Sequence, residues 1–279
     1  MTAARYSTNV PHHVDNSDWL KAFAIILVAV GHTGYFFIDD AAWWSVFGRM
    51  AAPVFFFLMG YARSRTIPLN WLWLGLILTL LDSWNNYWEW VPLNILFSMA
   101  LIRLSRPSVM SLLKRYTWVA FIVLVLGLLL VLQFAGDLFD YGAEGWLWAL
   151  LGLCQRMYVD GRSFSSLDET LEKSELTEHG MKQNWRLMRL PACLIAAAVY
   201  VWQEQVEFEF SDFQFIVVAV GVAVLSCVLS FFVRGPSRLQ PPQAVAVPLR
   251  WLGRHTLEIY VIQLAGSELI INLIPGLAA

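Results

Sequence analysis

The chain has 279 residues, of which 58% are hydrophobic and 14% are charged, and its formal net charge is -2 at pH 7. Soluble domains carry about 25% charged residues, so this composition excludes a soluble globular protein and predicts a polytopic protein whose first partner is the lipid bilayer. The sequence has no basic patch interleaved with stacking aromatics, so we expect no nucleic-acid partner.

Nine apolar segments predict an all-α membrane bundle formed by a single domain, residues 1–279. We expect about nine transmembrane helices, over residues 19–38, 43–62, 71–88, 91–104, 117–134, 145–158, 190–206, 213–233 and 249–274. The third and fourth segments are separated because a single helix across both would measure about 50 Å, which exceeds the thickness of a bilayer. A polar stretch at 160–186 is the expected cytoplasmic loop, with a short amphipathic helix in its sequence LDETLEKSEL.

The distribution of charge predicts the orientation of these helices. Of the 19 Lys and Arg residues, all except Arg49 fall at the N-terminus, at the start of the first helix or in the even-numbered connections. Acidic residues instead gather in the odd-numbered connections. Because basic residues remain on the cytoplasmic side of a membrane, this segregation predicts a cytoplasmic N-terminus. The polar first 17 residues do not have the form of a secretory signal peptide.

Three ionisable residues interrupt the first two apolar segments: Lys21, His32 and Arg49. Lys21 and His32 are eleven residues apart, so they lie on one face of a helix, about 16 Å apart along its axis. We expect His32 and Arg49 at similar depth on consecutive antiparallel helices. Asp82 is the expected partner of the Arg49 guanidinium, since a charge within a membrane needs one.

Other polar groups in the apolar segments have structural as well as functional interpretations. Thr256, Tyr260, Gln263 and Ser267 form one stripe on the last helix, and Asn85 and Asn86, near the end of the third segment, mark the break before the fourth. Tyr260 and Gln263 can instead have a structural role, in which each forms a hydrogen bond between two helices. Lys21 can simply extend its ammonium group to the interface. The three cysteines lie far apart in apolar stretches and predict no metal site.

The sequence around these residues resembles two families of membrane acyltransferases. Lys21-x10-His32 followed by PVFFFLMGYARSR, together with the late segment WLGRHTLEIYVIQL, is similar to the acyltransferase three family. The similarity to the TraX family of pilin acetylases is greater. It rests on Leu20-Lys21, on Gly31-His32-Thr33-Gly34, and on Gly48-Arg49 through Pro53-Val54-Phe55.

The resemblance implies transfer of an acyl group, acetyl in the TraX branch, from cytoplasmic acyl-CoA across the bacterial inner membrane. The implied acceptor is a pilin-like protein or an envelope glycan at the outer face, and no metal is required. His32 would be the general base. The other implied site residues are Arg49 and Asp82 in catalysis, Lys21, Arg63 and Arg65 on the phosphates of acyl-CoA, and Asn85, Asn86, Tyr260 and Gln263 on the substrates.

Two other classes of function compete with this hypothesis. The chain can be an inactive protein with the acyltransferase fold that packs as a structural subunit with other membrane subunits. A transporter has less support, because the sequence shows no inverted repeat and no pair of interrupted helices. A hydrophilic tunnel from the cytoplasmic side to His32 would favour the enzyme, and a cavity plugged by side chains would favour the structural subunit.

Overall fold

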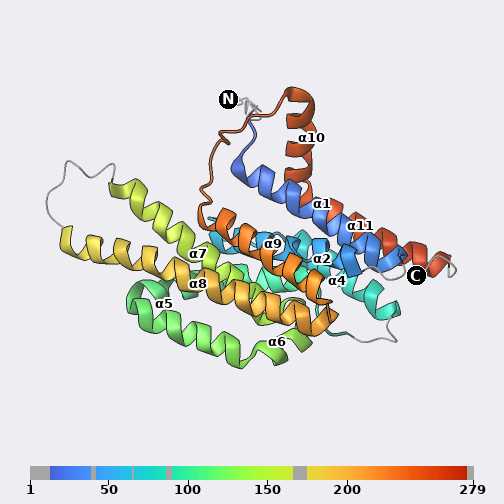
Figure 1. Ribbon diagram of the computed structural model, residues 1–279, viewed down its shortest axis with the longest axis horizontal. Helices are drawn as coiled ribbons and strands as arrows, with labels where there is room; N and C mark the ends of the chain where they lie inside the picture. Colours follow the sequence, from blue (N-terminus) through green and yellow to red (C-terminus); the bar gives the residue numbers. More distant parts are fainter. Residues whose placement is uncertain (1–12, 39–41, 65, 86–89, 166–174, 275–279) are drawn as a thin grey trace, which may run out of the picture.

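The computed structural model describes residues 13–38, 42–64, 66–85, 90–165 and 175–274. Every regular element in these ranges is an α-helix (Figure 1). The helices are α1 (Asn16–Phe37), α2 (Ala42–Gly48), α3 (Ala51–Tyr61), α4 (Leu69–Asn85), α5 (Ile95–Leu130), α6 (Leu132–Leu138), α7 (Gly142–Ser165), α8 (Glu175–Phe208), α9 (Asp212–Ser230), α10 (Gln243–Arg254) and α11 (Thr256–Leu273).

Six helical stretches within the described residues are long and apolar enough to cross a membrane. They are Asn16–Phe37, Ala42–Tyr61, Ile95–Leu130, Asn184–Phe208, Asp212–Ser230 and Thr256–Leu273, and Leu69–Trp84 is a shorter apolar helix. The predicted helical membrane bundle is therefore confirmed. The predicted number of nine spans is not confirmed.

Two boundaries differ from those expected. The fourth and fifth predicted segments form the two helical parts of α5, which meet at a kink at Thr117, the first residue of the fifth segment, where the backbone has φ 44° and ψ -109°. The expected connection between them, residues 105–116, is helical. The last predicted segment is divided at His255, so residues 249–254 belong to α10 and the apolar helix α11 begins at Thr256. Hydropathy did not reveal this second break because α10 is itself rich in apolar residues.

The polar stretch at 160–186 is helical over much of its length, contrary to the expected loop. Helix α7 continues to Ser165 and α8 begins at Glu175, so both helices extend beyond their apolar parts (Figure 1). Polar residues do not end a helix that is exposed to water, because its backbone groups bond to one another. Most of the segment LDETLEKSEL lies outside the described residues.

Helices α3 and α7 form the centre of the bundle and pack with their backbones in close contact. A methyl group at Gly60 would overlap the backbone of Ala149, and one at Gly152 would overlap the carbonyl group of Phe57. Around this contact Phe56, Phe57 and Trp148 have exposed fractions of 1% or less. Glycine lets two helices approach without a hydrophobic driving force, as membrane interfaces require.

Basic side chains cap the C-terminal end of α3, which faces the predicted cytoplasmic side. Arg106 of α5 donates to the carbonyl oxygens of Met59, Ala62, Arg63 and Ser64, and Arg156 of α7 donates to that of Ala62 at 2.6 Å. The last carbonyl groups of a helix lack partners within it and carry partial negative charge. These two arginines therefore stabilise the end of α3 in addition to any effect on orientation.

Candidate functional site

A close crossing between α1 and α2 positions His32 and Arg49. A Cβ atom added at Gly31 would lie 2.8 Å from the Cα of Gly48, so no larger residue fits at the contact without movement. His32 and Arg49 each follow one of these glycines along the chain. The crossing of the two antiparallel helices therefore places the His32 and Arg49 side chains at a similar depth.

His32 lies beside aromatic rings and faces a cavity. Its ring centroid is 5.8 Å from that of Tyr260 on α11 and 6.2 Å from that of Phe36. Its Nδ1 atom is buried and has no hydrogen-bond partner among the described residues. A buried polar nitrogen without a partner costs free energy unless a ligand or water completes it.

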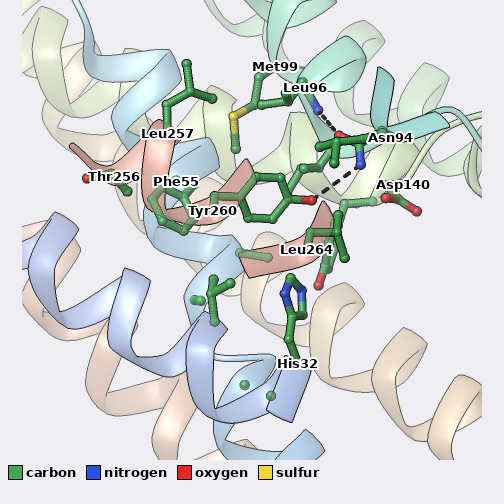
Figure 2. A pocket seen from close by; sticks show the side chains of 18 of the residues that line it. His32, Phe55, Asn94, Leu96, Met99, Asp140, Thr256, Leu257, Tyr260 and Leu264 are labelled. Carbon is green, nitrogen blue, oxygen red and sulfur yellow. Dashed lines mark hydrogen bonds between the residues drawn. The ribbon is translucent and has the colours of Figure 1, made fainter. Parts of the chain in front are cut away.

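The hydroxyl group of Tyr260 contacts the first turn of α5 (Figure 2). Asn94, the residue that caps α5, accepts a hydrogen bond from the backbone N–H of Leu96 at 3.0 Å through Oδ1. Its Nδ2 atom consequently points toward Tyr260, and donates to the phenol oxygen at 3.4 Å. The phenol hydrogen is then free to point into the cavity.

Gln263, predicted to contact substrate, links two helices. Its Nε2 atom donates to the backbone oxygen of Ala29 at 3.1 Å, which ties α11 to α1 one turn before His32. The structural interpretation of this residue therefore has direct support from the geometry.

Arg49 is held by acidic residues of α8. Its Nε atom lies 3.6 Å from Glu204 and its NH2 atom 3.3 Å from Glu207, and it donates to the hydroxyl of Tyr141 at 3.1 Å. The guanidinium group also lies 4.1 Å from the ring centroid of Phe208. Asp82 was the expected partner of Arg49, and the two glutamates were not expected, because they lie more than 150 residues away along the chain.

Asp140 joins the same region from the connection between α6 and α7. Burial raises the pKa of its carboxyl group to about 6, against the opposing effects of Arg49 and of the backbone N–H of Ile95 at the start of α5. The backbone oxygen of Asp140 accepts from Ser98 at 2.8 Å, and its backbone N–H donates to Leu93 at 2.9 Å. Asp140 is thus fixed in place at the edge of the bundle.

One cavity of about 860 Å³ joins the region of Lys21 to the region of His32 and Arg49. This volume lies in the range typical of sites for small molecules. Its middle is lined by apolar side chains, including Val28, Phe55, Leu58, Leu96 and Met99. A cavity thus joins the two regions, but its apolar middle differs from the hydrophilic tunnel that was expected for an enzyme.

Charge changes sign along this cavity. Lys21 and Arg254 line the end near the start of α1, where Lys21 has Arg103 and Arg234, and also Asp15 and Asp18, as electrostatic neighbours. Glu258 reaches this end too, with a carboxylate oxygen 3.8 Å from His255. Near the other end the lining includes Asp82, Asp140, Glu207 and Glu268. The cavity is thus mainly basic at one end and acidic at the other.

The remaining predicted site residues fall elsewhere or cannot be placed. Arg63 is 73% exposed and donates to Asp160 at 2.8 Å, on the outside of the bundle. Arg65 and Asn86 lie outside the described residues, as does the side chain of Asn85. Asn94, Asp140 and Arg254 were not among the predicted site residues, although the Pro-Leu-Asn sequence before an apolar run is a recognisable helix start. Among the described residues no group of three or more His, Cys, Asp or Glu side chains is arranged to hold a metal ion.

The fold and the cavity define a helical integral membrane protein with a polar site enclosed by apolar helices. A family model described as TraX protein matches residues 16–160, just over half of the chain. The chain belongs to the TraX family. No curated protein and no solved structure matches it.

Proposed function

We propose that this protein is a membrane acyltransferase that moves an acetyl group from cytoplasmic acetyl-CoA to an acceptor at the outer face of the bacterial inner membrane. The observation that carries the proposal is the single cavity lined by both Lys21 and His32. The TraX family, named for a protein related to pilin acetylation, supports the same chemistry.

The basic end of the cavity suits the phosphates of acetyl-CoA. Lys21 and Arg254 line it, and Arg103 and Arg234 add positive charge nearby. We assign binding of the acetyl-CoA phosphates to Arg254 and no longer to Arg63, because Arg63 is paired with Asp160 outside the cavity. With the phosphates at this end, the pantetheine arm would extend about 16 Å along α1 to His32, as eleven helical residues require.

The acidic end favours an acceptor that carries an amine. Asp82, Asp140, Glu207 and Glu268 would attract an ammonium group and hold it near His32. Such positioning of two reactants supplies a large part of the rate of a group transfer. An N-terminal amine of a pilin-like protein fits this charge better than a neutral glycan hydroxyl does.

In the proposed reaction a carboxylate at the acidic end takes one proton from the bound ammonium group, and the resulting neutral amine attacks the thioester carbonyl carbon. His32 takes the proton released from the nitrogen as the C–N bond forms, and passes it to the departing CoA sulfur as the C–S bond breaks. The hydroxyl group of Tyr260, held by Asn94, donates to the oxygen that becomes negative in the transition state. Arg49 stays bound by Glu204 and Glu207 and fixes the position of α2 relative to α8.

The experiment is transfer of label from radioactive acetyl-CoA by the purified protein in proteoliposomes with envelope fractions. His32→Ala should lower the rate at least about 100-fold, as expected for loss of a general base. The matched control is His255→Ala, since His255 is 48% exposed and lies outside the cavity. Full activity of His32→Ala would refute the mechanism, and no transfer by the wild-type protein would favour the structural subunit.

A further inference from the structure

Helix α10 has one buried face, which packs on the beginning of α1. Ala246, Leu249 and Gly253 are buried on this face, and the first two cluster with Val14 and Ala22. At Gly253 the contact is close, because an added Cβ atom would lie 2.9 Å from the backbone of Asp18. The buried face is therefore fully accounted for by α1.

The remainder of α10 is strongly amphipathic. Val245, Val247 and Trp251 are 48%, 51% and 55% exposed, and Pro248 lies between them. At about 100° per residue, the polar side chains of Gln243, Arg250 and Arg254 fall together on a narrow arc beside Val247. An exposed apolar face next to a basic arc is the pattern of a helix that lies within a membrane interface.

The position of α10 in the bundle agrees with that pattern. It ends at Arg254, immediately before the apolar helix α11 begins at Thr256, and it lies beside the beginning of α1. Figure 1 shows α10 running crosswise to both α1 and α11. If these two helices cross the membrane, α10 lies along its surface at their cytoplasmic ends.

We propose that α10 is an interfacial helix, with Val245, Val247 and Trp251 inserted in the inner leaflet and Arg250 on the phosphates of anionic lipids. This inference is independent of acyl transfer. It rests on the exposed face of α10, its basic arc and its direction. Since Gly253, Arg254 and Thr256 also line the cavity, lipid binding by α10 would hold the basic opening of the cavity at the membrane surface.

The test uses spin labels on single cysteines in the full-length protein, with Cys154, Cys193 and Cys227 replaced by serine. Labels at Val247→Cys and Val245→Cys, in vesicles that contain phosphatidylglycerol, should be accessible to oxygen and protected from a water-soluble nickel complex. A label at Gln243→Cys on the polar arc should show the opposite preference. Access of nickel to all three labels would place α10 in water and overturn the proposal.

The lipid composition tests the role of the arginines. The label at residue 247 should lie deeper with phosphatidylglycerol than with phosphatidylcholine alone, and Arg250→Gln should reduce this difference by at least half. Arg250 is the suitable position because, unlike Arg254, it does not line the cavity. If the label at residue 247 lies at the same depth in both kinds of vesicle, the proposal that α10 binds anionic lipids is wrong.

Discussion

Asn94 determines the direction of the hydrogen bond to Tyr260. Its Oδ1 atom is occupied by the N–H of Leu96, so its amide nitrogen must face the phenol. Aspartate caps a helix as well as asparagine does, but its carboxylate offers no N–H. Asn94→Asp should therefore retain the fold and turn the phenol hydrogen away from the cavity.

We expect Asn94→Asp to lower kcat about 100-fold with little change in KM, similar to the loss of one oxyanion donor. Tyr260→Phe should have the same effect, and the double variant should be no slower than either single variant. Steady-state kinetics of the three proteins test this. An Asn94→Asp enzyme with full kcat would show that the orientation of Tyr260 does not matter.

Asp140 should make stability depend on pH. Burial raises the pKa of its carboxyl group to about 6 in the folded protein, above its ordinary value of 3.8. The folded state then holds the proton more tightly than the unfolded state does. The contribution of Asp140 to the stability of the folded state is therefore fully present below about pH 4 and is lost as pH rises through about 6. We expect the free energy of unfolding to fall by about 2 kcal/mol over this range. This is less than the full difference in pKa implies, because the carboxyl group lines a cavity.

Thermal unfolding in detergent between pH 4 and pH 7 tests this prediction. The Tm of Asp140→Asn should rise relative to the wild type as the pH increases, because asparagine does not ionise. A constant difference in Tm across this range would contradict the prediction. Asp160→Asn is a suitable control at a carboxylate already paired with Arg63 and Arg156.

Among the helices, the contact between α3 and α7 should tolerate the least change. Gly152 has no room for a methyl group, because it would meet the carbonyl of Phe57. Gly127, in the interior of α5, has no atom within 4 Å of an added Cβ. The two positions therefore form a matched pair in which alanine has opposite effects.

We predict that Gly152→Ala lowers the free energy of unfolding by about 1–3 kcal/mol through overpacking. Gly127→Ala should leave it unchanged or raise it by about 0.5–1 kcal/mol, since alanine favours a helix over glycine. Denaturation followed by circular dichroism in detergent compares the two variants. Equal stability of both would show that α3 and α7 are not in close contact.

The orientation of the whole molecule follows from its connections. Residue 212, at the start of α9, should face outward, and residue 238, between α9 and α10, should face the cytoplasm. Both side chains are exposed. A thiol reagent that does not cross membranes should label Asp212→Cys in spheroplasts of a variant lacking the native cysteines. It should label Arg238→Cys after permeabilisation only, and the reverse pattern would invert the proposed direction of transfer.

The sequence by itself determined the class of protein and part of the site. Hydropathy and charge are local properties that add along the chain, so they identified the membrane helices and the unusual residues Lys21, His32 and Arg49. They did not determine the number of spans, because the expected connection at 105–116 is helical and the break at His255 lies within an apolar stretch. The TraX motifs of α1 to α3 likewise needed no tertiary information.

Tertiary structure decided the contacts between distant residues. Glu204 and Glu207 bind Arg49, Asn94 orients Tyr260, and Arg254 joins Lys21 at the cavity. These pairs are brought together by helix packing over long separations in the chain, and no periodic pattern records that packing. The cavity itself is a property of the assembled bundle, since its walls come from helices at both ends of the sequence.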